Sequence, residues 1–260
     1  MKKFLHIVLW AALLAGVIAA MAFAEKQHRQ ALCTGFDLLI ENPSQDMLMQ
    51  AGEIKSKILE ITDTFAGRAI VDVDLHRISN ILKANPFIAD ADVLADISGK
   101  VRVEVMLRRP VMRLENLQGN DYYIDEDGWL IPVNPGHPVR VVIASGYLRD
   151  KIPVSADGKV QVSSLAKGSI LPALYRMAMI IDHSDFLKKL IAQVWVGNNE
   201  DIVLSPVIGD YKIRFGKPAD LQEKFDKLET FLREGAGNTG WIDYRSVDLR
   251  YDNQIICSKK

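Results

Sequence analysis

The side chains best able to do chemistry in this chain are a short acidic run, an arginine pair and scattered histidines. Asp125-Glu126-Asp127 precede Gly128 without the spaced oxygen ligands of a calcium-binding loop, so the pattern predicts a plain hairpin turn. Arg108-Arg109 stand directly before Pro110, where we expect ion pairs or solvent, with acidic partners as the alternative. The histidines lie far apart, so no zinc site is expected. They are His6, His28, His76, His137 and His183.

The chain carries no sequence signature of an enzyme. A nucleophile elbow, a phosphate-binding loop, HExxH and CxxC are all missing from the sequence. A hydrolase would need a nucleophile and a base assembled from distant residues, and this is the weakest alternative. We therefore expect neither catalysis nor a bound cofactor.

The composition is that of a globular body with balanced charge. Charged residues make up 25% of the chain and apolar residues 48%, and the net charge is −1. Because no basic block is present, the sequence lacks the electrostatic footprint of a nucleic-acid binder. Cys33 and Cys257 lie near opposite ends of the body, so we expect two unpaired thiols, with a disulfide as the alternative in an exported domain.

One apolar segment, Phe4 to Ala24, precedes a body that has no second one. As a helix this segment is roughly 31 Å long, enough to cross a hydrocarbon core of about 30 Å. We expect residues 1–3 to be a cytoplasmic stub, residues 4–24 a retained transmembrane helix, and the body to lie outside the inner membrane. The alternative is a signal peptide, because Ala22-Phe23-Ala24 fits a small-x-small cleavage site.

The first part of the body predicts a strand, two helices and two strands. Residues 36–40 fit a strand, and Ile54 and Ile58 recur at helical spacing. Asp72 or Asp74 can cap the second helix. The last two strands, residues 89–95 and 101–107, alternate in polarity like half-buried strands. Such a unit covers one face of a small sheet with two helices.

Beyond the arginine pair the chain is mostly β. Helices are predicted over residues 170–181, where Pro172 fits the first turn, and over residues 221–232, which Gly235 ends. Strands are predicted over residues 111–114, 122–124, 129–132, 139–144, 194–196, 202–204, 211–215, 241–244 and 247–257. We therefore expect an α+β fold with a mainly antiparallel β domain and flanking helices.

The motifs on these elements resemble those of a known family. Residues 85–93 are similar to the helix-to-strand passage of a POTRA domain, and residues 101–111 are similar to the junction that closes it. With residues 123–128 and the sequence VDLRYD at residues 247–252, the order of motifs resembles the bacterial FtsQ/DivIB cell-division family. The resemblance covers nearly the whole chain. It implies a POTRA domain over residues 36–108 and a β domain over residues 109–260.

The resemblance also implies a function. The family is a non-enzymatic scaffold of the inner membrane, enriched at the division septum, that links early and late division proteins. Its periplasmic POTRA and β domains recruit the small bitopic coiled-coil proteins FtsB (DivIC) and FtsL, with FtsK and septal synthase components as further partners. In the family, the partner adds a strand to the C-terminal edge of the β domain, which the terminal VDLRY segment, residues 247–251 here, is expected to form next to the preceding helix. This is physically sound because an edge strand offers unpaired backbone groups.

The same resemblance places the binding residues at this edge. Arg250 would pair with an acidic group of the partner, with an internal ion pair as the alternative, and Tyr251 would be an aromatic anchor. Lys227 and Phe231 of the preceding helix would flank the site. The remaining expected contacts are Asp252, Asn253, Gln254 and Ile255. Unlike the family pattern, the sequence has no aromatic residue after this segment.

An alternative from another class is an exported POTRA-containing chaperone or assembly factor for outer-membrane or secreted proteins. Such factors carry several POTRA repeats and a barrel of about 8–26 strands. This sequence has one repeat-like unit and too few residues for a large barrel, which favours the scaffold.

Overall fold

The structure is a computed structural model of the 260-residue chain. It describes residues 6, 9–10, 12–21, 32–41, 48–62, 67, 69–96, 99–115, 117, 119, 121–150, 159–235, 244–252 and 254–260. Contacts within the chain divide it into two compact units. The first unit ends at Leu107 and the second begins at Arg108, with Leu48 belonging to the second.

The N-terminal apolar segment is described in part, and its residues 12–21 are helical. Within the described part of the chain, no helix is both long and apolar enough to cross a membrane. The predicted transmembrane helix, residues 4–24, extends outside the described residues, so the anchor stays a prediction.

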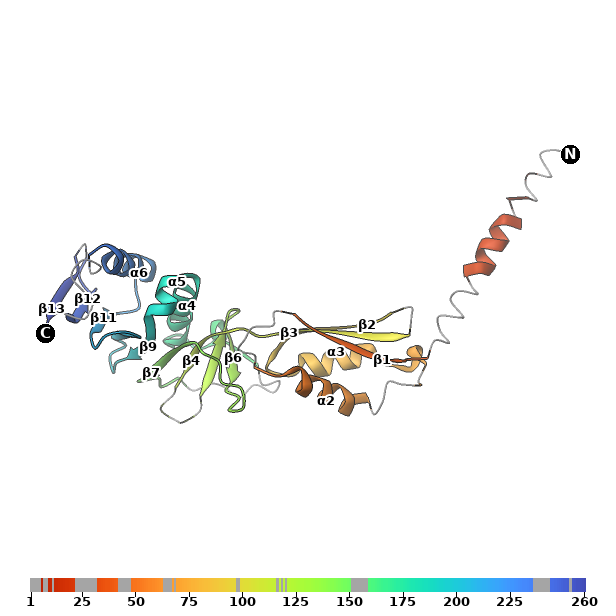
Figure 1. Ribbon diagram of the computed structural model, residues 1–260, viewed down its shortest axis with the longest axis horizontal. Coiled ribbons are helices and arrows are strands. Elements are labelled where there is room, and N and C mark those ends of the chain that lie inside the picture. Colours follow the sequence, from red (N-terminus) through yellow and green to blue (C-terminus); the bar gives the residue numbers. More distant parts are fainter. Residues whose placement is uncertain are drawn as a thin grey trace. The chain divides into compact units, whose positions relative to one another are not determined.

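The first unit is a three-stranded sheet with two helices, as predicted (Figure 1). Its strands lie in the order β1-β3-β2, with β1 parallel and β2 antiparallel to β3. Cys33 of this unit is a buried free thiol. The elements are β1 (Gly35–Glu41), α2 (Ala51–Thr62), η1 (Ile70–Asp72), α3 (Leu75–Lys83), β2 (Ile88–Ala95) and β3 (Lys100–Leu107).

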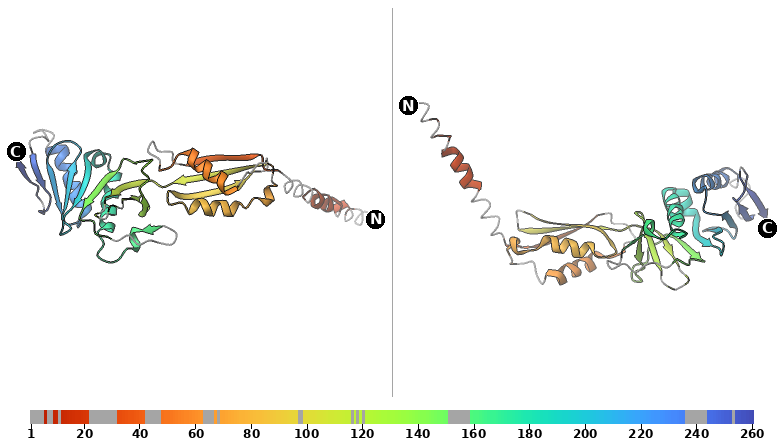
Figure 2. Two further views of the ribbon diagram at one scale, coloured as in Figure 1. Left: turned by 90° about the horizontal axis from the view of Figure 1, so that it is seen from below. Right: turned by 180° about the vertical axis from the view of Figure 1, so that it is seen from behind.

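Local sequence sets the limits of α3. The Asp74 carboxylate accepts the backbone N–H of Arg77 at 2.9 Å, so Asp74 rather than Asp72 is the N-cap. The helix ends at Lys83 because Asn85-Pro86 follows. Both helices lie on one face of the sheet (Figures 1 and 2). The buried side chains between these layers include Ile54, Ile58, Ile78, Leu82, Val101, Val103 and Val105.

The second unit is built on one long sheet whose described strands pair in the order β13-β12-β11-β10-β9-β7-β4-β5-β6-β8. Six of these nine described pairings are antiparallel and three are parallel, which confirms a mainly antiparallel β domain. The strands are β4 (Pro110–Leu114), β5 (Tyr122–Asp125), β6 (Trp129–Pro132), β7 (Val142–Gly146), β8 (Val160–Gln161), β9 (Ile191–Val196), β10 (Ile202–Pro206), β11 (Lys212–Gly216), β12 (Tyr244–Asp248) and β13 (Ile256–Lys259).

Three helices lie on one face of this sheet (Figures 1 and 2). They are α4 (Leu171–His183), α5 (Asp185–Leu190) and α6 (Leu221–Thr230), and short helical turns follow β8 (η2, Val162–Ser164) and α6 (η3, Phe231–Gly235). Pro172 lies in the first turn of α4, as predicted. The apolar stripe of α6, including Phe225 and Leu228, packs into one hydrophobic core with the inward residues of the strands. Among those inward residues are Val194, Leu204, Ile213 and Val247.

The acidic run forms the predicted hairpin turn between β5 and β6. Asp125 Oδ1 accepts the backbone N–H groups of Asp127 and Trp129, while its Oδ2 lies 2.7 Å from Arg108 Nη1. The Arg108 guanidinium also stacks over the Trp129 ring, 5.2 Å from its centroid. Burial raises the pKa of Asp125, and the hydrogen bond from Arg108 partly opposes that shift. Arg108 is therefore ion-paired inside the unit, as expected.

One strand is shorter at its start than the sequence predicts. The prediction covers residues 139–144, whereas β7 begins at Val142. β4 pairs with β7 only from Val142 onward, and β9 starts directly after α5. Since no described strand runs beside residues 139–141, the backbone N–H of Val139 donates to the Tyr123 hydroxyl at 3.0 Å instead.

Candidate partner-binding edge

The predicted binding residues lie where the long sheet ends. Among the described strands, β13 is outermost and pairs on one side only, antiparallel to β12. β12 lies between β13 and β11, to which it is parallel. An edge strand presents unpaired backbone N–H and C=O groups, so another extended segment can continue the sheet at β13.

The C-terminal segment is not one continuous strand, contrary to the prediction for residues 247–257. β12 ends at Asp248 and β13 starts at Ile256, and the described residues between them belong to no strand. The expectation that the VDLRY segment itself forms the edge is therefore wrong, because β13 lies outside it. The chain leaves β12 where the backbone N–H of Arg250 donates to the Asp248 carboxylate at 3.1 Å, a local bond that competes with the ladder.

For Arg250 the sequence left two expectations open, a contact with the partner and an ion pair within the chain. The structure shows an ion pair within the chain, with Asp248. Its Nε lies 2.9 Å from Oδ1 of Asp248 and its Nη2 lies 2.6 Å from Oδ2. These hydrogen bonds lower the pKa of Asp248 against the opposing effect of burial. The stem of Arg250 lies over Gly216, where an added Cβ would stand 2.7 Å from Arg250 Cγ. Gly216 thus leaves the space through which Arg250 reaches Asp248.

The structure brings Lys227 and Tyr251 into contact. Lys227 Nζ on α6 donates a hydrogen bond to the main-chain carbonyl of Tyr251 at 2.8 Å. Tyr251 as a residue is nevertheless 44% exposed. The helix therefore fixes the backbone of this turn while the ring stays accessible, an arrangement that suits an aromatic anchor.

The other expected contact residues divide into exposed and core-facing positions. Asp252 and Gln254 are exposed, whereas Ile255 packs against the hydrophobic core. Phe231 is half-buried against Tyr244, the first residue of β12, with ring centroids 5.8 Å apart. Asn253 lies outside the described residues.

Sequence reasoning missed the side chains of β13 itself. Cys257 lies opposite Val247, packs against the core and is a free thiol, as expected for an unpaired cysteine. Ile256 is 45% exposed, and Ser258 Oγ lies 2.7 Å from Ser246 Oγ. The sequence signals for the break before β13 are the adjacent turn-forming residues Asp252 and Asn253 and an aspartate placed two residues before an arginine. Nothing in the sequence links Gly216 to this turn.

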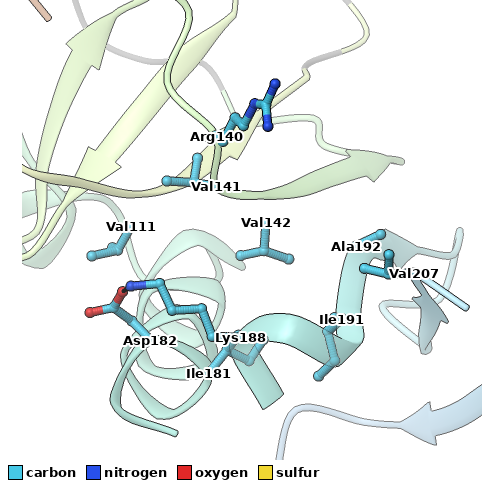
Figure 3. Close-up of a pocket in the computed structure, with 10 residues that line it drawn as sticks. All are labelled: Val111, Arg140, Val141, Val142, Ile181, Asp182, Lys188, Ile191, Ala192 and Val207. Atoms are coloured by element: carbon cyan, nitrogen blue, oxygen red, sulfur yellow. Dashed lines mark hydrogen bonds and ion pairs between the residues drawn. The ribbon is translucent and has the colours of Figure 1, made fainter. Parts of the chain in front are cut away.

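This unit also has a pocket of about 270 Å³ beside the starts of β7 and β9 (Figure 3). On its polar side, Asp182 accepts hydrogen bonds from Lys188 at 2.7 Å and from Arg109 at 2.9 Å. Burial alone would raise the pKa of Asp182, but these hydrogen bonds outweigh it and lower the pKa. With its one acid bound by two cations, the pocket offers no free acid or base. Its aliphatic walls include Val111, Val141, Val142, Ile181, Ile191 and Val207.

The described residues hold no group of three or more His, Cys, Asp or Glu side chains placed to bind a metal ion. The edge at β13 offers backbone hydrogen bonding, one exposed aromatic ring and one arginine held by an aspartate. Groups of these kinds recognise an extended polypeptide.

A strand–helix–helix–strand–strand unit followed in the chain by a long sheet with an exposed end defines a two-domain, POTRA-containing class of protein. Residues 31–106 match the family model for a POTRA-like domain, and residues 109–258 match the one described as FtsQ/DivIB, C-terminal related. Over 205 residues the chain is 24% identical to the cell division protein FtsQ of Syntrophotalea carbinolica, in an alignment that covers 78% of this chain and 68% of that protein. The chain therefore belongs to the FtsQ/DivIB family, and its role is in cell division.

Proposed function

We propose that this protein is a non-enzymatic scaffold that recruits small coiled-coil proteins to the division septum. Residues 4–24 anchor it in the inner membrane, with the N-terminus in the cytoplasm and the body in the periplasm. The POTRA domain spans residues 36–108 and the β domain residues 109–260. The partners are single-span proteins of the FtsB (DivIC) and FtsL kinds, and FtsK and septal synthase components are further candidates.

The observation that carries this proposal is the open edge of β13. β13 is short, and only its inner side is paired among the described strands. Charged side chains on an edge strand commonly discourage pairing with another chain. β13 has one charged residue, Lys259, and it lies at the end of the strand, so such charges hinder pairing here only slightly. A partner strand gains main-chain hydrogen bonds here, and the alternating side chains of β13 set its register.

The turn before β13 supplies specificity in the proposal. Tyr251 is the exposed anchor, and Lys227 holds its backbone in place. Arg250 uses Nε and Nη2 to bind Asp248, and its Nη1 group has no hydrogen bond to any residue that the structure describes, so in the proposal Nη1 donates to a carboxylate of the partner. Arg250 therefore contributes both by shaping the turn and by selecting an acidic neighbour.

Photo-crosslinking in cells tests the identity of the partner. A photoreactive amino acid replaces Tyr251, and the captured protein is identified by mass spectrometry. We expect a small single-span coiled-coil protein, and no such adduct from the same probe at Gln222, which is exposed on α6. An outer-membrane barrel component would instead favour the assembly-factor alternative, and no adduct from a folded protein would remove the proposal.

Affinity measurements test the role of the turn. Tyr251→Ala and Arg250→Glu are each expected to weaken partner binding at least about 30-fold, the loss that corresponds to a hot-spot residue. Arg176→Glu is the matched charge reversal, because Arg176 is exposed on α4 away from this edge. Unchanged dissociation constants for both turn variants would exclude strand addition at β13.

A further inference from the structure

The pocket of the second unit lies where two neighbouring strands of the long sheet stop pairing (Figure 3). β7 and β9 are paired from Ile143 and Gln193 onward. The residues of both strands that come before this pairing, including Val141 and Ala192, line the pocket together with residues of α4 and α5. The strands β12, β11 and β10 separate β9 from β13, so the pocket is a site apart from the candidate edge.

The main chain of Val141 borders the pocket with unused hydrogen-bonding groups. In an extended chain, successive residues direct their backbone groups to opposite sides. The backbone N–H of Glu115 donates to the carbonyl of Ala144 at 2.8 Å, so the even-numbered residues of β7 face β4. By this alternation the backbone groups of Val141 face the β9 side, and they make no hydrogen bond to any residue that the structure describes. An extended segment that enters the gap can therefore bond to them.

The interior of the pocket suits an aliphatic side chain. A dry apolar cavity of about 150 Å³ holds one benzene molecule. The pocket of about 270 Å³, with its valine and isoleucine walls, therefore has room for one large apolar side chain and part of the main chain that carries it. The apolar surface continues outside the pocket between β10 and β11, where Val207 is 59% exposed and Ile208 is 64% exposed. These two residues add apolar contact area for a bound segment.

The rim of the pocket carries a cation that no described carboxylate neutralises. Arg140 is exposed, and its guanidinium extends away from the aliphatic walls (Figure 3). Lys188, the other cation that lines the pocket, is bound to Asp182. An incoming carboxylate can therefore pair with Arg140 without displacing a described partner, whereas an incoming cation would be repelled.

We propose that this pocket binds an extended segment of a partner protein in which an aliphatic residue is flanked by acidic residues. The aliphatic side chain fills the cavity, the backbone of the segment bonds to Val141, and a flanking carboxylate pairs with Arg140. A peptide meets all three conditions at once, whereas a lipid chain would leave the backbone groups of Val141 unpaired. The inference goes beyond strand addition at β13 and does not depend on it.

Titration of the full-length protein with short synthetic peptides, followed by NMR of its valine and isoleucine methyl groups, tests this site. The first probe is a capped peptide with one leucine between aspartates. In the second probe serine replaces the leucine, and in the third lysines replace the aspartates. We expect the first peptide to shift the methyl signals of Val111, Val142 and Ile191 and to bind at least about 10-fold more tightly than the serine peptide. The lysine peptide should also bind more weakly than the first. Equal affinities, no binding of the first peptide, or shifts that spare the pocket would overturn the proposal.

Variants with matched controls locate the binding. Ala192→Trp places a large side chain at an exposed position of the pocket and should weaken binding of the first peptide at least about 10-fold. Arg140→Glu should weaken it and reduce its dependence on salt. Ala166→Trp and Arg176→Glu make the same changes at exposed positions that do not line the pocket and should leave the affinity unchanged. Unchanged affinity in both pocket variants would overturn the proposal. Loss of peptide binding in Tyr251→Ala would likewise overturn it, because the peptide would then lie at β13, and the proposed function would still stand.

Discussion

Lys227 of α6 and Tyr251 of the C-terminal turn are joined by a hydrogen bond from the lysine ammonium group to the tyrosine main-chain carbonyl, at 2.8 Å. The bond connects the helix to the segment that leads into β13. The position of the candidate binding turn therefore depends on α6, although the helix and the turn lie far apart in sequence.

Replacing this lysine should loosen the turn without unfolding the domain. Lys227→Met keeps the aliphatic stem and removes the donor, so we expect faster amide hydrogen exchange in residues 249–252. The free energy of unfolding should fall by no more than about 0.5–1.5 kcal/mol, the net value of one hydrogen bond. Lys224→Met is the matched control, because Lys224 Nζ donates to a different carbonyl, that of Lys217. Equal exchange in the two variants would show that Lys227 does not hold the turn.

The buried pair of Arg108 and Asp125 should be far more sensitive than its exposed neighbour. Arg108→Ala leaves the Asp125 carboxylate buried without its cation, for which we expect a loss of about 3–5 kcal/mol in urea denaturation. Arg109→Ala removes a cation that is 39% exposed and should cost clearly less. If both variants lose the same free energy, burial does not determine the value of this pair.

The free energy of unfolding should fall on acidification in part because of Asp248. Hydrogen bonds from Arg250 lower the folded-state pKa of Asp248 below its ordinary value of 3.8. Its contribution to stability is therefore present above that ordinary value and is lost as pH falls through the lower folded value. Asp125 acts in the opposite direction, because burial raises its pKa, so its contribution is present at low pH and lost as pH rises through the raised value.

A pH series of urea denaturation checks this assignment. Asp248→Asn should be less stable than the wild type at neutral pH and should lose less stability on acidification. Arg250→Ala should show the same weaker dependence of the free energy of unfolding on acidic pH. It keeps the Asp248 carboxylate but removes the hydrogen bonds that lower its pKa. If Asp248→Asn loses as much stability on acidification as the wild type does, that loss comes from other carboxylates.

The sequence predicts the described strands best where apolar and polar residues alternate without ambiguity. It predicts them less well where a single side-chain contact determines where a strand ends. The strands at residues 101–107 and 211–215 alternate cleanly and form as expected, apart from their end residues. The break after Asp248 depends on a contact with Arg250 that a strand pattern does not reveal. The exposure of Trp195 likewise follows from its pairing with Val203, because alternation alone leaves open which side of a strand faces the core.

Gly216 should be intolerant of even the smallest side chain, for two separable reasons. Its φ is +77°, a left-handed conformation that costs a residue with a Cβ about 1–2 kcal/mol. An added Cβ would also stand 2.7 Å from Arg250 Cγ and would push Arg250 away from Asp248. Gly168→Ala is the control, because Gly168 has φ +99° and no atom within 4 Å of an added Cβ. We expect Gly216→Ala to lose more stability than Gly168→Ala in urea denaturation.

A double-mutant cycle separates the two causes at Gly216. In an Arg250→Ala background the crowding Cγ is absent, and the remaining Arg250 Cβ lies 3.7 Å from the added methyl group, an ordinary contact. Gly216→Ala should then cost only the backbone strain, close to the loss in Gly168→Ala, so the two substitutions should show a coupling energy. Strictly additive losses would mean that Arg250 does not depend on the space above Gly216. The ion pair with Asp248 would then have to be held in place by other contacts of the turn.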